Sequence, residues 1–202
     1  MHDQMKYQAD PIALAVAAAV MLCWFVFAGI FIFRQRPPRS EHQRRDNRSR
    51  TGVLITGAGY ASAWFLQRPH FTPVWAMPRA LEIIIGLLTA GIAVCSVWLV
   101  LAAVRTLGRQ WKVVAGLVEG HQLVTSGPYA MVRHPIYTGM LGLLLATGLA
   151  LSVWYAVPVA IFLGWCGTLI RINSEEKLLR EAFGERYAVY AKRVPALFPR
   201  IF

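Results

Sequence analysis

Long apolar runs constrain this chain more than any other feature of its sequence. They cover residues 11–33, 80–104 and 136–170. A helix needs about 20 apolar residues to cross the hydrocarbon core of a bilayer, where its backbone polar groups must be satisfied internally. Each of the first two runs is long enough for one crossing. The third suits two short crossings joined by a bend at Ser152, Trp154, Tyr155 and Pro158. A hydrophobic content of 56% with only 15% charged residues agrees with a membrane protein.

Residues 53–66 form a further candidate span, which is shorter and contains Gly57, Gly59 and Ser62. Small residues let helices approach closely, so this segment favours helix packing over lipid contact. The sequence therefore predicts an all-α, polytopic integral membrane protein with about five transmembrane helices, or four if this segment only lies in the interface. We divide it into an amino-terminal three-span membrane region, residues 1–104, and a carboxyl-terminal core, residues 105–202.

The basic residues predict the orientation of the chain. Seven arginines fall within residues 34–50, and further basic residues follow in 105–133 and after residue 170, whereas only Lys6, Arg68 and Arg79 fall on the other side. Cytoplasmic loops retain Arg and Lys, so we expect an external amino terminus and a cytoplasmic carboxyl terminus. The small size and the small number of spans favour the plasma membrane of a prokaryote. Because the net charge of +11 is sorted into loops, it indicates contact with anionic membrane lipids rather than with nucleic acid.

A polar motif, "SGPYAMVRHPIYTG" at residues 126–139, directly precedes the last apolar run. Its Ser-Gly-Pro start predicts a turn, and Pro135 suits the first turn of the helix that follows. We expect His134 and Tyr137 to lie together at the amino-terminal end of a membrane helix, where backbone N–H groups and the helix dipole form a polar pocket. The alternative is that Arg133 and His134 are interfacial anchors and that the tyrosines belong to an aromatic belt.

A second polar cluster follows the last apolar run. Arg171 and Glu175 are four residues apart, so they share one face of a helix. We expect a carboxyl-terminal cytoplasmic amphipathic helix here, which ends at Gly184 and has an apolar stripe of Leu178, Leu179, Ala182 and Phe183. The alternative is a solvated helix with an internal ion pair worth a few tenths of a kcal/mol. The cysteines, Cys23, Cys95 and Cys166, lack metal-ligand spacing and are interpreted as packing residues, so we predict no metal site.

The order of the two clusters resembles the isoprenylcysteine carboxyl methyltransferase family of integral membrane enzymes. "HQLVTSGPYAMVRHPIYTG" is followed by a two-span hairpin, then by Arg171, Glu175 and "FGERYAVYAKRVP", so that the resemblance covers about residues 108–199. It implies a cytoplasm-facing pocket for S-adenosyl-L-methionine that the carboxyl-terminal segment closes. It assigns Arg171 to the methyl acceptor. The implied cofactor contacts are His121, Gln122, Leu123, Val124, Tyr129, His134, Pro135, Ile136, Tyr137 and Glu175.

The residue types agree with methyl transfer to a carboxylate. Displacement at a sulfonium methyl mainly requires that donor and acceptor are aligned and that water is excluded. A carboxylate is already ionised near neutral pH and needs no general base, but it needs a cation, and the guanidinium of Arg171 is suited to it. We therefore expect a lipophilic carboxylate, such as a prenylated cysteine, that arrives from the bilayer. His134 is then a hydrogen-bond partner of the cofactor rather than a base.

Other functions remain open at this level. The wider superfamily includes phospholipid N-methyltransferases and small-thiol S-methyltransferases, although an amine acceptor calls for a nearby base rather than an arginine. Sterol reductases share part of the motif, but the sequence contains no separate dinucleotide fingerprint. A non-catalytic membrane adaptor would use the basic loops to bind lipid or a partner and would keep the motif only as a helix cap.

Overall fold

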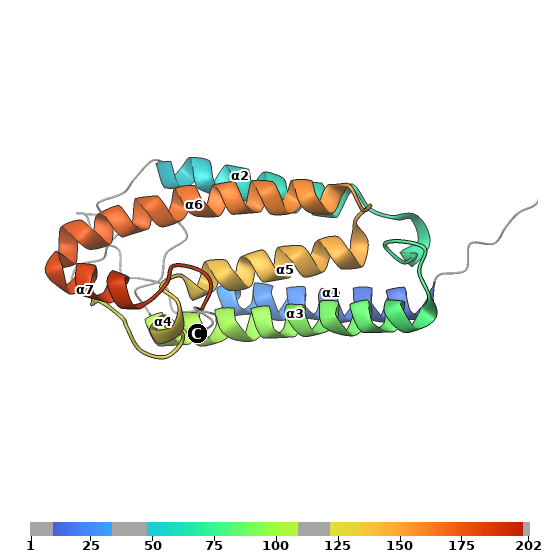
Figure 1. The fold of residues 1–202 in the computed structure, drawn as a ribbon, viewed down its shortest axis with the longest axis horizontal. Coiled ribbons are helices and arrows are strands. Elements are labelled where there is room, and N and C mark those ends of the chain that lie inside the picture. The colour runs from blue at the N-terminus through green and yellow to red at the C-terminus, as the bar shows by residue number, and fades with distance from the viewer. Residues whose placement is uncertain (1–9, 34–47, 109–121, 200–202) are drawn as a thin grey trace, which may run out of the picture.

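The computed structural model describes residues 10–33, 48–108 and 122–199, and the regular elements in these ranges are all helices (Figure 1). Proline stands at the first position of four of these elements, at Pro11, Pro69, Pro128 and Pro135. The elements are α1 (Pro11–Ile32), α2 (Arg48–Phe65), the 3₁₀ turn η1 (Pro69–Phe71), α3 (Arg79–Leu107), α4 (Pro128–Met131), α5 (Pro135–Leu151), α6 (Ala156–Phe183) and α7 (Glu185–Arg193).

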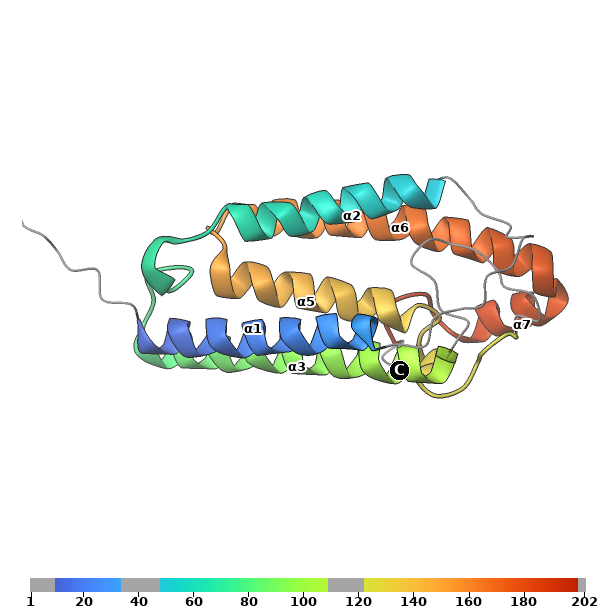
Figure 2. The same ribbon diagram turned by 180° about the vertical axis from the view of Figure 1, so that it is seen from behind.

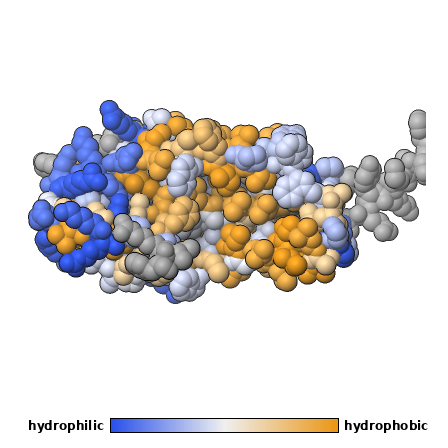
Figure 3. All heavy atoms as spheres, in the orientation of Figure 1, coloured by the Kyte–Doolittle hydropathy of each residue, from blue (hydrophilic) through white to orange (hydrophobic). Residues whose placement is uncertain are grey.

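The five longest of these helices run side by side as a bundle. α2 packs along α6, α3 packs against α1 and α5, and α5 lies between the two groups (Figures 1 and 2). Hydrophobic side chains cover the middle of the bundle, while hydrophilic side chains gather at the end that holds α7 (Figure 3). α1, α3 and α6 are long and apolar enough to cross a membrane, and α5 is apolar but shorter, with 17 residues. These features are those of an integral membrane protein.

The predicted helical hairpin at the end of the apolar sequence is confirmed. α5 ends at Leu151 and α6 begins at Ala156, with Pro158 in the first turn of α6. The other predicted spans correspond to α1, α2 and α3, although α2 begins at Arg48 rather than at residue 53. α2 does not reach the apolarity of a membrane span. The count of five spans and the orientation therefore stay predictions.

The predicted tail helix is the final part of a longer helix. α6 continues without interruption from the apolar sequence through Arg171 to Phe183. It ends as expected at Gly184, which has φ +52°, a conformation that glycine adopts without steric cost. α7 then turns back and packs against α6 (Figure 1). Arg171 and Glu175 are thus held by the same rigid helix that forms the second arm of the hairpin.

Close packing between α2 and α6 depends on small residues. A Cβ atom added to Gly59 would lie 2.8 Å from the Ala160 carbonyl oxygen, and one added to Gly167 would lie 2.6 Å from the Gly52 carbonyl oxygen. A Cβ atom on Gly52 itself would lie 2.6 Å from Cγ of Arg171. The backbone of α2 therefore forms a wall against the stem of Arg171 and limits the positions that this side chain can take.

Candidate functional site

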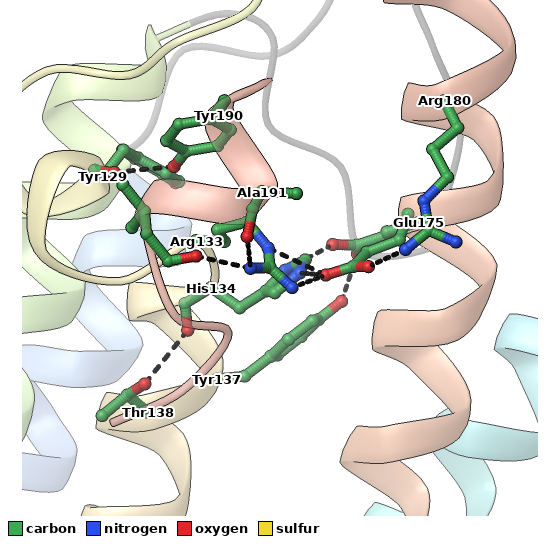
Figure 4. A network of polar contacts seen from close by, with 11 residues as sticks. Tyr129, Arg133, His134, Tyr137, Thr138, Glu175, Arg180, Tyr190 and Ala191 are labelled. Atoms are coloured by element: carbon green, nitrogen blue, oxygen red, sulfur yellow. Dashed lines mark hydrogen bonds and ion pairs between the residues drawn. The ribbon is translucent and has the colours of Figure 1, made fainter. Parts of the chain in front are cut away.

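The candidate site lies at the end of the bundle that holds α7 (Figure 4). Residues 132–134 and the first turn of α5 form one side, and the second half of α6 forms the other. α7 and the residues after it lie across these two elements. The α5–α6 hairpin places the start of α5 beside the second half of α6. The two polar motifs, which are more than one helix apart in the sequence, therefore meet here.

Glu175 is the centre of one set of contacts. The Tyr137 hydroxyl donates a hydrogen bond to Oε1 of Glu175, and Nδ1 of His134 lies 3.5 Å from its Oε2. The His134 and Tyr137 rings are stacked, with centroids 5.8 Å apart. Cζ of Arg171 lies 4.5 Å from the centroid of the Tyr137 ring, which is a cation–π contact. The four residues therefore form one continuous cluster.

Glu176, the next residue, is held by three cationic groups. Its Oε1 accepts from Arg133 Nε at 3.0 Å and Nη2 at 2.6 Å, and it lies 3.3 Å from His134 Nε2. Its Oε2 accepts from Arg180 Nη2 at 2.8 Å. The Glu176 side chain is only 9% exposed, whereas that of Glu175 is 26% exposed. Glu175 is thus the carboxylate that a ligand can reach, and Glu176 is committed to internal contacts.

The carboxyl-terminal segment, residues 190–197, is attached across the start of α5. Arg133 Nη1 donates to the carbonyl oxygens of Ala191, at 2.9 Å, and Val194. The backbone N–H groups of Arg133 and His134 donate to the carbonyls of Pro195 and Ala196 at 2.8 and 3.0 Å. Two hydroxyl groups add bonds at the ends, from Thr138 to the Leu197 carbonyl and from Tyr190 to the Tyr129 carbonyl, both at 2.6 Å. This segment therefore covers the site.

The electrostatics of the cluster favour a charged imidazole. Burial by itself lowers the pKa of His134, but its hydrogen bonds to Glu175 and Glu176 outweigh burial and raise that pKa above its ordinary value. An imidazolium donates through both ring nitrogens and so links the two carboxylates. Burial raises the pKa of Tyr190 to about 12, so its phenol remains a donor at physiological pH.

The predicted site residues fall into two groups. His134, Tyr137, Arg171 and Glu175 come together in the cluster described above. Three of the others line a neighbouring apolar region: Tyr129 and Ile136 pack with Val100, Ala103 and Val104, and Val124 packs against the same group. Pro135 is buried in the first turn of α5, Leu123 is half-buried and Gln122 is exposed. His121 lies outside the described residues.

Sequence reasoning did not assign a role in the site to Arg133 or Glu176. Arg133 was interpretable as an interfacial anchor, and Glu176 as one member of a helical pair with Arg180. Their mutual ion pair spans 43 positions and depends on the closure of the α5–α6 hairpin. The only signal in the sequence is the charge of two residues that each neighbour a predicted site residue.

Comparison with known proteins gives a family match for part of the chain. Residues 87–181 match the model of the isoprenylcysteine carboxyl methyltransferase (ICMT) family. The cobalt-zinc-cadmium resistance protein CzcN of Cupriavidus metallidurans is 39% identical over 106 residues, which are 49% of this chain and 46% of that protein. Protein-S-isoprenylcysteine O-methyltransferase B of Arabidopsis thaliana is 36% identical over 104 residues, which are 48% of this chain and 50% of that protein.

A third relative aligns over most of both chains. The probable protein-S-isoprenylcysteine O-methyltransferase of Oryza sativa subsp. indica is 27% identical over 190 residues, covering 91% of this chain and 99% of that protein. The chain spans only about half the length of the first two relatives. The family match at residues 87–181 includes all of α5 and the site residues His134, Tyr137, Arg171 and Glu175.

Proposed function

We propose that this chain is an S-adenosyl-L-methionine-dependent methyltransferase, because residues 87–181 match the model of the isoprenylcysteine carboxyl methyltransferase family. Its proposed acceptor is the carboxylate of a lipophilic molecule of the prenylcysteine type. The observation that carries the proposal is the meeting of Arg171 and Glu175 with His134 and Tyr137, which come from two separate motifs.

The residues of the cluster fit the chemical groups of S-adenosyl-L-methionine. Its α-ammonium group or a ribose hydroxyl would donate to Glu175, which retains access while Glu176 does not. The face of an aromatic ring attracts cations, such as the sulfonium of the cofactor. The Tyr137 ring already makes a contact of this kind with the guanidinium of Arg171. The bound cofactor would supply an electrophilic methyl group on a sulfonium. Residues 190–197 would cover the pocket and reduce the access of water.

Arg171 is the proposed holder of the acceptor carboxylate. It is only 6% exposed and directly follows the apolar first half of α6. A planar guanidinium in such surroundings binds a carboxylate through two charge-assisted hydrogen bonds and fixes its direction. The carboxylate oxygen is already a nucleophile, so no residue has to remove a proton from it. His134, as an imidazolium between the two glutamates, would keep Glu175 oriented.

The proposal can be tested by methyl transfer to N-acetyl-S-farnesylcysteine, with radiolabelled cofactor and protein in detergent. A base-labile methyl ester is the expected product. Arg171→Lys retains the charge but loses the paired hydrogen bonds, which are worth about 1.5–3 kcal/mol, so we expect kcat/KM for the acceptor to fall about 10- to 150-fold. Glu175→Gln is expected to weaken cofactor binding, measured by calorimetry, without unfolding the protein.

Arg180→Gln is the matched control, because Arg180 is 63% exposed and its hydrogen bond goes to Oε2 of Glu176, the oxygen that does not contact Arg133 or His134. It should leave both the acceptor and the cofactor parameters close to those of the wild-type protein. Folded protein that binds no cofactor would contradict the methyltransferase proposal as a whole. Cofactor binding with label only in base-stable N-methyl or S-methyl products would retain the enzyme class and refute the carboxylate acceptor.

A further inference from the structure

A small cavity lies at the other end of the bundle, away from the candidate site. Its volume is about 30 Å³, and its walls come from the amino-terminal parts of α1 and α3, the carboxyl-terminal end of α5 and the loop between α2 and α3. Most of the lining is apolar, including Ile12, Val16 and Met77. Two charged side chains, Arg68 and Glu82, also line it.

Glu82 is the unusual member of this lining. It is only 8% exposed, and its Oε2 accepts from Arg79 Nη1 at 2.8 Å. Its Oε1 is enclosed and has no hydrogen-bond partner among the described residues. An enclosed carboxylate oxygen without a donor loses its hydration and gains nothing in return, which is costly for a charged group. Such an atom beside a cavity indicates a ligand that supplies a hydrogen-bond donor.

The surrounding cationic groups balance the negative charge of Glu82 only in part. Arg79 also pairs with Asp10, the N-cap of α1, so that one guanidinium serves two carboxylates. Arg68 is directed elsewhere: its guanidinium donates to the carbonyls of Thr72, Leu149, Ala150 and Ser152 at 2.6–3.0 Å. The charge of Arg68 thus complements the carbonyl end of α5. A donor that also carries positive charge would balance Glu82 best.

The chemistry of Glu82 restricts that donor more than the size of the cavity does. About 10–15 Å³ is enough for one water molecule, so a cavity of about 30 Å³ has room for a small polar group. A trimethylammonium group has no N–H to donate to Oε1 of Glu82, whereas a primary ammonium group has such donors. We propose that the cavity binds a primary ammonium group at Glu82, from the ethanolamine headgroup of a membrane lipid or from a free amine.

The neighbourhood of the cavity suits a zwitterionic headgroup. The side chain of Arg79 is 51% exposed, so it can contact a phosphate while Glu82 holds the ammonium group. Phe71 and Trp75 in the α2–α3 loop are exposed, and aromatic residues of this kind concentrate at the headgroup level of membranes. This binding site is independent of the methyltransferase proposal, since it lies at the opposite end of the helices.

The test uses the full chain in nanodiscs of phosphatidylethanolamine or phosphatidylcholine with the same acyl chains. Native mass spectrometry of protein released from a mixture of the two lipids measures which one is retained. We expect at least about tenfold preference for phosphatidylethanolamine in the wild-type protein. Glu82→Gln keeps the shape but removes the charge and should abolish the preference. Glu185→Gln changes an exposed acid at the other end and should leave the preference intact.

A second experiment tests whether a free amine, rather than a lipid headgroup, can occupy the cavity. Ethanolamine added to phosphatidylcholine nanodiscs should raise the unfolding temperature of the wild-type protein, and tetramethylammonium at the same concentration should not. Retention of both lipids in equal amounts, together with no response to ethanolamine, would overturn the proposal and leave the cavity to water. If Glu82→Gln does not fold, these two wild-type measurements still decide the question.

Discussion

Arg133 and Arg180 offer a direct test of how the site is held together, because both contact the same carboxylate. Arg133 is 13% exposed, donates twice to Glu176 and also holds two carbonyls of residues 190–197. Arg180 is 63% exposed and makes one bond to Glu176 within the same helix. The two arginines therefore differ in burial and in the number of groups that they connect, while the partner is constant.

Breaking a buried ion pair from one side costs about 3–5 kcal/mol, because the remaining charge stays buried. His134 and Arg180 still compensate Glu176 after Arg133→Gln, so we expect the lower end of this range, about 3 kcal/mol. Arg180→Gln removes an exposed i, i+4 pair, which is worth only about 0.3–0.5 kcal/mol. For a chain of this length, the expected decreases in Tm are about 6–12 °C for Arg133→Gln and about 1–2 °C for Arg180→Gln.

Thermal unfolding in detergent, followed by tryptophan fluorescence, measures the global effect. Hydrogen exchange of residues 185–199 measures the local one, and we expect faster exchange there for Arg133→Gln alone. Equal decreases in Tm for the two variants would refute the reasoning, because burial would then have no influence on the strength of the pair. Unchanged exchange in residues 185–199 would show that Arg133 does not hold the carboxyl-terminal segment.

Three further predictions concern other parts of the fold. The raised pKa of His134 means that its ion pairs stabilise the protein fully below about pH 6.5 and are lost as the pH rises through the folded-state pKa. Tm should therefore fall as the pH is raised above about 6.5, and less steeply in His134→Gln. Gly167→Ala should destabilise the α2–α6 pair by about 1–3 kcal/mol, whereas Gly57→Ala, where the added methyl group meets nothing within 4 Å, should not lower the free energy of unfolding. Arg68→Ala should lower the stability by at least about 2 kcal/mol in chemical denaturation, since it leaves carbonyls at the end of α5 without a donor, and Arg68→Lys should recover part of the loss.

Much of the helical framework was predictable because a bilayer imposes a simple requirement on the sequence. The runs at residues 11–33 and 80–104 became α1 and α3 within a few residues, and the bend after residue 151 was marked by polar and proline residues. α2 was harder to predict, because a helix held by glycines against a neighbour does not need the apolarity of a lipid-facing helix. Its start at Arg48 inside a basic segment carried no apolar signal.

The candidate site was predictable only in part. His134 and Glu175 belong to motifs whose order resembles that of a known family, and the structure brings them to within 3.5 Å of each other. The roles of neighbouring residues could not be read in the same way, because Glu175 and Glu176 are both acidic and adjacent on one helix. Their different contacts depend on which of the two carboxylates faces Arg133 and which remains more exposed.

Local sequence thus determined where the helices lie and which residue types stand at their ends, since the spacing of apolar, proline and glycine residues acts over a few turns. Tertiary structure decided which of those residues meet. Arg133 binds a carboxylate 43 positions away in the chain, and Arg68 binds carbonyls of α5 that are more than 80 positions away, and burial sets the strength of each contact. Electrostatic strength depends on distance and solvent exposure, and neither quantity exists until the helices have packed.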